Sequence, residues 1–250
     1  MKSYFAGATP LILAHRGFAV AARENTLAAF AAALEAGATH IESDIQVTAD
    51  GIAVLFHDDD LEREFGTKGK VSHRTLAELR ALTSERDQIP TLEEAIRAFP
   101  KAKFNFDIKS EGAVLPTVRA LAEAEDCTRF LVSSFSYRRR VAALNELRKR
   151  GKDVATSADA RTLLLLRLLF ALGLKPWFAR VAKSVDALQI PVRLGPIRFD
   201  RQRFVAWARD CSIEIHFWTI NDPEEMLRLT RLGATGIVTD RSDLAATVWE

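Results

Sequence analysis

The stretch HIESDIQVTADGIAVLFHD, residues 40–58, decides the fold. Its first part, His40–Ile45, reads as a strand whose two carboxylates share one face. A second apolar run, Ile52–His57, follows the turn signal Asp50-Gly51 and ends in a histidine. We therefore predict that the second run is a hairpin partner or an extension of the first strand.

Similar short apolar runs recur along the whole chain. The other candidate strands are Leu11–His15, Lys103–Lys109, Phe130–Ser134, Val154–Ser157, Ala187–Ile190, Glu214–Ile220 and Gly236–Thr239. The candidate helices between most of them are Thr26–Ala36, Leu92–Phe99, Val114–Ala124, Tyr137–Arg150, Arg161–Leu172, Arg201–Asp210, Pro223–Leu232 and Leu244–Trp249. Strands that alternate with helices favour a parallel sheet covered by helices.

This order of elements predicts an α/β fold, a single (β/α)₈ barrel of the TIM type. Nine strand candidates fit a barrel if Ile52–His57 only accompanies the second strand. No long linker divides the chain, so we expect one domain over residues 1–250. A doubly wound open sheet is the alternative, although the glycine motifs GxGxxG and GxxxxGK[ST] of such folds are missing.

Three helix starts carry capping signals. Asn25 precedes the first, alanine-rich helix, Thr91 precedes two glutamates, and Asp222 precedes Pro223. We interpret these residues as N-caps.

The composition narrows the class of protein. The 250 residues are 48% hydrophobic and 27% charged, with a formal net charge of +2. Nucleic-acid surfaces need clustered excess positive charge, so we expect no nucleic-acid partner. We interpret the one dense basic run, Arg138–Arg140, as a solvated helix face. The start of the chain has no apolar stretch typical of a signal peptide, and a cytoplasmic location is the default expectation.

One segment, TLLLLRLLFALGLKPWF at Thr162–Phe178, is strongly apolar. Arg167 and Lys175 interrupt it, and it is shorter than the roughly 20 residues that cross a bilayer, so we expect no transmembrane span. We expect a buried helix of the barrel. The alternative is an apolar lip near the barrel mouth, with peripheral lipid contact through Leu163–Phe178.

Ionisable residues gather at the ends of the apolar strands. His15 and Arg16 end the first strand, and Glu42 and Asp44 point the same way on the second. His57 closes the hairpin run, and Asp107 and Lys109 share a face further along. The carboxyl ends of barrel strands converge on one mouth, so the fold would bring these groups together.

Such a group has a restricted chemistry. Three carboxylates are the oxygen ligands that Mg²⁺ or Ca²⁺ prefers, and two histidines suit an acid/base pair. Arginine and lysine complement a phosphate. Together they indicate cleavage of a phosphodiester, although each piece alone has a structural interpretation, such as a simple ion pair between Asp107 and Lys109.

A longer succession of motifs resembles the glycerophosphodiester phosphodiesterase family. The matching motifs are His15-Arg16-Gly17, Glu24-Asn25-Thr26, Phe30, Gly37-Ala38, Ile41-Glu42-Ser43-Asp44, Thr48, Asp50-Gly51, His57-Asp58, Gly66-Thr67, Gly69-Lys70-Val71, the helix TLAEL, Ile89-Pro90-Thr91-Leu92-Glu93-Glu94, Ser133-Ser134-Phe135, Phe217-Trp218-Thr219-Ile220-Asn221 and Gly236-Ile237-Val238-Thr239-Asp240. They follow one another in order over nearly the whole chain, which makes the resemblance specific.

The resemblance implies a TIM barrel and metal-dependent cleavage of a glycerophosphodiester into glycerol phosphate and an alcohol. The roles it implies are acid/base catalysis for His15 and His57, metal binding for Glu42, Asp44 and Asp107, phosphate binding for Arg16 and Lys109, and a wall on the glycerol side for Trp218. Asp107 stands where the commoner pattern has Glu, one methylene longer, which affects metal distance and preference. Glu24 would orient Arg16 or approach the metal. Asp58 would either hold a residue of the site in place or cap the backbone.

The connection Glu62–Lys70 is short, so we expect no inserted cap domain and an open mouth. An open mouth would admit lysophospholipids, which makes lysophospholipase D activity the main alternative. No residue decides against a mechanism through a cyclic phosphate. A barrel that binds a metal or phosphate ester without turnover is the non-enzymatic alternative, and the intact histidine pair argues against it.

Overall fold

Eight parallel strands form a ring in the computed structural model, which describes residues 2–7, 9–84 and 87–249. In their order around the ring they are β6 (Ala155–Thr156), β5 (Phe130–Ser133), β4 (Lys103–Ile108), β2 (His40–Val47), β1 (Leu11–Ala14), β11 (Gly236–Thr239), β10 (Glu214–Trp218) and β7 (Ala187–Pro191). A parallel bridge between Ser157 and Ala187 joins the last strand to the first. The predicted (β/α)₈ barrel is therefore confirmed, and the open sheet is wrong.

The ninth predicted strand is the hairpin partner that the opening stretch indicated. β3 (Ala53–Leu55) pairs with β2 in the antiparallel direction, with Leu55 opposite Ile45. β3 runs back from Ala53, beside Val47, to Leu55, beside Ile45, and the Phe56 N–H donates to the Asp44 carbonyl at 3.0 Å. His57 therefore follows beside the carboxyl-terminal half of β2, which carries Asp44.

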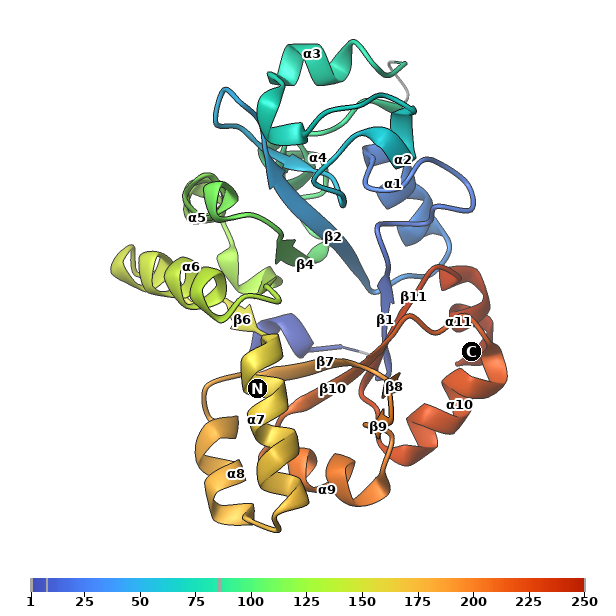
Figure 1. Cartoon of the computed structure of the whole chain (residues 1–250). Coiled ribbons are helices and arrows are strands. Elements are labelled where there is room, and N and C mark those ends of the chain that lie inside the picture. Colours follow the sequence, from blue (N-terminus) through green and yellow to red (C-terminus); the bar gives the residue numbers. More distant parts are fainter. Residues whose placement is uncertain (1, 8, 85–86, 250) are drawn as a thin grey trace.

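Helices surround the ring (Figure 1). Those that match the predicted ones are α1 (Leu27–Glu35), α4 (Leu92–Ala98), α5 (Val114–Glu123), α6 (Tyr137–Lys149), α7 (Ala160–Ala171), α9 (Gln202–Asp210), α10 (Pro223–Leu232) and α11 (Ser242–Val248). The helix TLAEL of the quoted motifs is α3 (Leu76–Arg80). The structure adds α2 (Glu62–Phe65), α8 (Lys175–Ala182) and the small hairpin of β8 (Arg193–Leu194) and β9 (Ile197–Arg198). These additions are short and lie in connections, where hydrophobic periodicity gives little signal.

The capping predictions hold at two of three helices. Thr91 and Glu94 form a capping box at α4, and the Asp222 side chain accepts a hydrogen bond at the start of α10. The prediction for Asn25 is wrong, because Thr26 caps α1 by accepting from the Ala29 N–H. The Asn25 side chain instead donates a hydrogen bond to Asp44.

The amino end of the barrel, which we call the floor, is filled by the 3₁₀ turn η1 (Ser3–Phe5). The Tyr4 ring lies 4.7 Å from the His40 ring, and the Phe5 ring lies 6.0 Å from the His216 ring. All four side chains are buried. The floor is thus a packed core, and only the opposite end offers a mouth.

The apolar segment Thr162–Phe178 is two helices rather than one. Gly173, with φ of 72°, separates α7 from α8, and Leu164, Leu168 and Leu172 are all more than half exposed. The expectation of a buried barrel helix is wrong, because only the inner side of the pair packs on α9, through residues such as Phe178. No helix in the described part of the chain is long and apolar enough to cross a membrane.

The basic run at the start of α6 also differs from expectation. Arg140 is buried and pairs with Asp159 at 2.8 Å, and Arg139 donates to Ser134 Oγ at 3.1 Å. The interpretation as a solvated face holds only for Arg138. Arg140 links the starts of α6 and α7, which no linear pattern could indicate.

Candidate active site

The carboxylates of the site lie side by side on two neighbouring strands. Glu42 and Asp44 are on β2, and Asp107 on β4 stands directly beside Asp44 in the parallel register. All three are at least nine-tenths buried. The barrel therefore brings together the carboxylates that the sequence singled out, at the expected end of the strands.

Lys109 joins two of these carboxylates. Its Nζ lies 2.8 Å from Asp44 Oδ1 and 2.7 Å from Asp107 Oδ2. Burial disfavours the charged amine, but the two carboxylates outweigh it and raise the pKa of Lys109, which stays protonated. Burial also opposes ionisation of Asp44, yet Lys109, His57 and Arg16 hold its pKa below the usual range. The ion pair expected as the structural interpretation of Asp107 and Lys109 is present, at the centre of the site.

The negative charge of Glu42 is balanced by nearby positive charge less well than that of Asp44. It accepts a hydrogen bond from the Arg16 N–H at 3.1 Å, and burial followed by the charge of Asp44 raises its pKa. Burial likewise raises the pKa of Asp107. The cluster thus carries more negative charge than Lys109 and Arg16 neutralise comfortably.

Arg16 sits on a tight turn that aims its side chain at the cluster. Its φ is +56°, the left-handed region that non-glycine residues rarely adopt. Its Nη1 donates to Glu24 at 3.0 Å, and its Nε lies 3.4 Å from Asp44 Oδ2. Glu24 therefore orients Arg16, which is the first of the two roles expected for it. Asn25, also at φ +56°, donates to Asp44 Oδ2 at 3.2 Å, so it supports the site instead of capping a helix.

Each of the two site histidines is held by a carboxylate at the same ring atom. His15 Nδ1 lies 2.7 Å from Asp240 Oδ1, and His57 Nδ1 lies 2.6 Å from Asp58 Oδ1. Burial disfavours the charged form of His15, but the bond to Asp240 and the charge of Glu42 raise its pKa. With Nδ1–H given to a carboxylate, each ring has Nε2 available for proton transfer.

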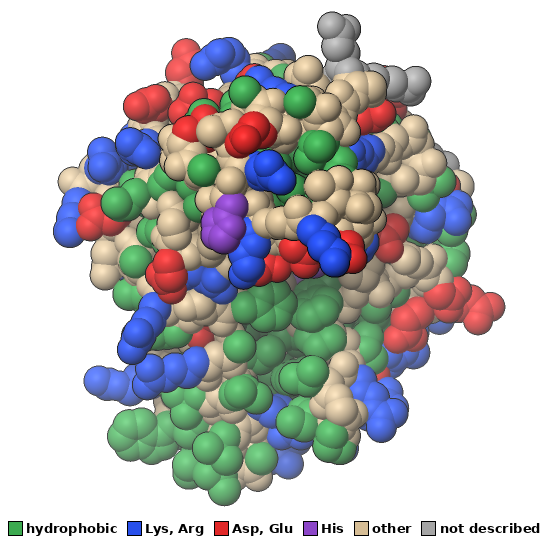
Figure 2. Space-filling model, turned by 45° about the horizontal axis from the view of Figure 1, so that its top comes forward, with side chains coloured by type: hydrophobic (Ala, Val, Ile, Leu, Met, Phe, Trp, Pro, Cys, Tyr) green, Lys and Arg blue, Asp and Glu red, His purple; other side chains and the backbone are tan. Residues whose placement is uncertain are grey.

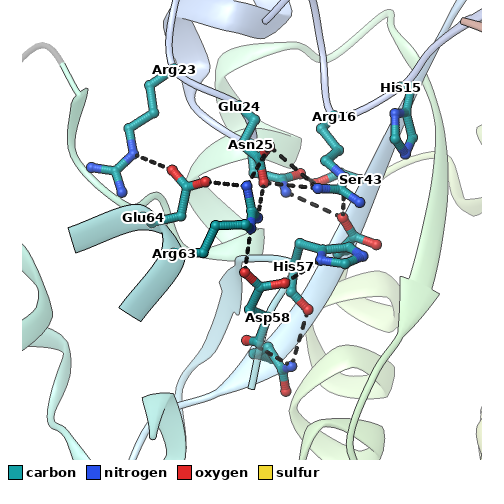
Figure 3. Close-up of polar contacts among 12 residues, drawn as sticks. His15, Arg16, Arg23, Glu24, Asn25, Ser43, His57, Asp58, Arg63 and Glu64 are labelled. Atoms are coloured by element: carbon teal, nitrogen blue, oxygen red, sulfur yellow. Dashed lines mark hydrogen bonds and ion pairs between the residues drawn. The ribbon is translucent and has the colours of Figure 1, made fainter. Parts of the chain in front are cut away.

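A charged network lies behind His57. Arg63 donates through Nε to Asp58 at 2.5 Å and through Nη2 to Glu24 at 2.7 Å, and it also pairs with Glu64. Figure 3 shows Arg63 with these three carboxylates around it. Because Glu24 in turn holds Arg16, the network couples the position of His57 to that of Arg16.

Comparisons with known proteins agree with this geometry. The family model described as "Glycerophosphoryl diester phosphodiesterase family" matches residues 15–244. The chain belongs to this family. It is 35% identical to a "Probable glycerophosphodiester phosphodiesterase 2" of Mycobacterium tuberculosis, over 94% of this chain and 88% of the relative. It is 27% identical to the human "Lysophospholipase D GDPD1", over 91% of this chain and 82% of the relative.

A solved structure of the same family confirms the architecture. The crystal structure of the glycerophosphodiester phosphodiesterase from Thermotoga maritima superposes with a TM-score of 0.76 and 28% sequence identity, covering 97% of this chain and all of that one. The predicted family is therefore confirmed, and with it the enzyme class of phosphoric diester hydrolases.

The family resemblance implied a divalent cation, and the donor set can be compared with that requirement. Glu42, Asp44 and Asp107 offer hard oxygen atoms, and the raised pKa values of Glu42 and Asp107, caused first by burial, show a cost that a cation would relieve. Within residues 2–7, 9–84 and 87–249, however, no three His, Cys, Asp or Glu side chains converge closely enough to hold a metal. The three carboxylates are the type of ligand that a hard cation prefers. Between Asp44 and Asp107, the Lys109 ammonium supplies part of the positive charge.

Several site residues of this family member had no role predicted from the sequence. Asp240 holds His15, and Asn221 donates to Asp240 Oδ2 at 2.7 Å. Both stand inside quoted family motifs, so the signal was present, but only closure of the barrel brings the C-terminal end of β11 beside His15. Arg63 belongs to a connection without any motif, and nothing in the sequence indicated it.

Trp218 and Phe135 form an aromatic pair beside Lys109. The two rings are 6.1 Å apart and nearly perpendicular, and Lys109 Nζ lies 5.6 Å from the centre of the Phe135 ring. Trp218 is partly buried against the barrel interior, whereas Phe135 is 58% exposed. The sequence predicted a role for Trp218 only, and the structure places an open aromatic surface next to it.

Proposed function

We propose that this chain hydrolyses glycerophosphodiesters to glycerol phosphate and an alcohol, with His15 and His57 as the general acid/base pair. The observation that carries the proposal is the fixed Nδ1 of both rings, on Asp240 and Asp58. One imidazole accepts a proton from the attacking water as its oxygen bonds to phosphorus, and the other donates a proton to the oxygen of the leaving alcohol as the bond from that oxygen to phosphorus breaks. Two oriented rings with free Nε2 atoms suit that exchange.

The phosphate would lie between Arg16 and Lys109. Arg16 contacts Glu24 through Nη1 and Asp44 through Nε, which leaves Nη2 for a phosphate oxygen. Lys109 stays charged and offers a point charge from the end of β4, two strands away from β1. Trp218, with Phe135, would form the wall on the glycerol side of the substrate.

We also propose that Glu42, Asp44 and Asp107 hold Mg²⁺ or Ca²⁺. Such an ion supplies Lewis-acid polarisation of the phosphate when it is bound. The buried, mutually repelling carboxylates support this role. Since Asp107 is shorter than the glutamate of the commoner pattern, preference between the two ions would be a property of this chain. We further propose that residues 1–250 act as one catalytic domain without an inserted cap.

The test is release of glycerol-3-phosphate from glycerophosphocholine, measured with EDTA and then with Mg²⁺ or Ca²⁺ restored. We expect turnover that chelation removes and one of the ions restores. Full activity after thorough chelation would take the metal out of the proposal. Absence of turnover in a folded, metal-loaded protein would contradict hydrolysis of this diester.

A second candidate is lysophospholipase D activity on the same site. The exposed Phe135 and the exposed leucines of α7 favour an acyl-bearing substrate, and a human relative carries that name. Choline release from lysophosphatidylcholine, set beside the assay above, separates the two candidates. A peripheral lipid contact through Leu163–Phe178 belongs to this candidate.

The third candidate is a barrel that binds a metal or a phosphate ester without turnover. Binding alone requires no oriented proton donor and acceptor, so the two histidine–carboxylate pairs argue against it. Phosphate-ester binding by a protein that turns over neither substrate would support it.

A further inference from the structure

The outer side of the α7–α8 pair carries an unusual concentration of exposed apolar side chains. Six of the twelve exposed large hydrophobic side chains among the described residues lie here, namely Leu164, Leu165, Leu168, Leu172, Leu174 and Trp177. We call these six the hairpin face. Figure 2 shows hydrophobic side chains gathered at the lower left, where Figure 1 places α7 and α8. Scattered exposed leucines are normal on proteins, but a contiguous group marks a surface that is covered in use.

The hairpin face is surrounded by positive charge. Residues 160–185 contain five basic residues, Arg161, Arg167, Lys175, Arg180 and Lys183, and no acidic residue. Lys175 pairs with Asp210 at 2.7 Å, and the other four have no ion pair within the described part of the chain. A surface that combines exposed leucines and a tryptophan with unpaired cations complements an anionic lipid headgroup layer.

We propose that the hairpin face docks on the surface of a bilayer that contains anionic phospholipids. Its leucines and Trp177, which is 61% exposed, would enter the boundary of headgroups and acyl chains, where tryptophan is favoured. A second copy of this chain is a poorer occupant. Twofold contact through the same face would bring the cations of both copies together.

The hairpin face is connected to the active site by further exposed aromatic residues. Tyr137 is 42% exposed under the guanidinium of Arg161, 5.0 Å away, and Phe135 accepts a hydrogen bond at its carbonyl from the Ala160 N–H at 3.2 Å. Phe135 itself contacts Trp218. The first turn of α7 is thus joined by a backbone hydrogen bond to the loop that carries Phe135, one of the two aromatic residues beside Lys109.

The docking does not depend on which diester the site cleaves, and it is tested by cosedimentation with vesicles. The wild-type chain is mixed with vesicles of phosphatidylcholine alone or with phosphatidylglycerol added. We expect binding to the anionic vesicles that weakens with salt. Leu168→Glu should reduce this binding about tenfold or more, because it replaces an exposed leucine that would enter the lipid by a charge of the same sign as the anionic headgroups.

The matched control is Leu115→Glu on α5, because Leu115 is 57% exposed and Leu168 is 55% exposed. Both variants should keep the wild-type thermal midpoint, which shows an intact fold whichever diester the site cleaves. Failure of the wild type to bind anionic vesicles would overturn the proposal, and so would equal losses in the two variants. A wild-type dimer that Leu168→Glu converts to a monomer would also overturn it, because the face would then serve self-association.

Discussion

The mouth and the floor of the barrel each hold two histidines, and the structure treats them in opposite ways. At the mouth, His15 and His57 are partly exposed and each is bonded to a carboxylate. On the floor, His40 bonds to the Tyr4 carbonyl and His216 to Gln189, and neither ring bonds to a carboxylate among the described residues. Burial, as the largest cause, lowers the pKa of His40 to about 4 and that of His216 to about 3.

This difference separates catalytic from structural histidines by their partners. An imidazole in contact with a carboxylate can accept a second proton at modest cost, whereas a buried one without such a partner stays neutral. The raised pKa of His15 and the lowered pKa of His216 are the two sides of the same rule. A histidine in an apolar strand can therefore be assigned only when its neighbours in space are known.

The largest expected effect is the loss of an imidazole at the mouth. His15→Ala and His57→Ala should each lower kcat about 10²–10⁴-fold, the usual contribution of a general acid or base. Their thermal midpoints should stay near wild type, because both side chains are partly exposed. His73→Ala, on the exposed turn η2 (Val71–His73), is the control. Near wild-type turnover in either mouth variant would remove that histidine from the proposed pair.

The second largest effect is expected from the loss of the carboxylate that holds His15. Asp240→Asn removes the charge that raises the pKa of His15, so the limb of the pH–rate profile that reports His15 should move to lower pH. Turnover should fall on the order of 10–100-fold, because the ring loses its preferred tautomer. The control is Asp243→Asn, which breaks only a surface pair with Arg241. An unmoved profile in Asp240→Asn would mean that Asp240 does not tune His15.

On the floor, the prediction is for stability. The folded pKa of His216, about 3, lies below its unfolded value near 6.5, so the unfolded state binds more protons between these limits. This contribution to the free energy of unfolding is complete above pH 6.5 and is lost as pH falls, by at most about 1.4 kcal/mol per pH unit. Urea denaturation from pH 7.5 to 5.0 should show a smaller slope for His216→Leu than for wild type.

The control is His73→Leu, which replaces an exposed histidine and should leave that slope unchanged. A slope in His216→Leu equal to that of wild type would show that the floor histidine is not the source of the acid sensitivity. Wild-type turnover of the variant at pH 7.5 would further separate the floor from the mouth.

The fold was predictable because its signals are local. Each barrel strand is a short apolar run, and the Asp50-Gly51 turn identified β3 as the extra strand. Periodicity failed for the α7–α8 pair, because a run of leucines on every side of a helix cannot show which side is covered. The packing of Phe178 on α9 determines which side of the pair is covered, and this is a contact between segments that are distant in the sequence.

The site was predictable only in part, for a related reason. Motif positions gave the carboxylates, the histidines and the two cations, and the strand period gave their common face. The partners of the histidines differ in this respect: Asp58 is adjacent to His57, whereas Asp240 is 225 positions from His15. Parallel pairing of β1 with β11 creates the second contact, and a single sequence does not reveal such pairing.

The smallest expected effect comes from the residues that hold the two orienting carboxylates. Arg63 supports Asp58 by an ion pair, and its side chain is 47% exposed. Exposed pairs contribute about 0.2–1 kcal/mol, so Arg63→Ala should lower kcat only about two- to fivefold. Asn221 supports Asp240 by a neutral donor, so the two supports differ in their sensitivity to salt.

The different salt sensitivity of the Arg63 and Asn221 contacts allows the two supports to be compared by experiment. At about 0.5 M salt the Debye length is about 4 Å, so Arg63→Ala should approach wild type as the ion pair is screened. Asn221→Ala should keep its deficit, because a short hydrogen bond from an amide is not screened in this way. Arg74→Ala, which removes a comparably exposed pair with Glu78, controls for general surface charge. Equal salt responses of the Arg63 and Asn221 variants would mean that Arg63 acts through packing, and the two mouth histidines would then be supported in the same way.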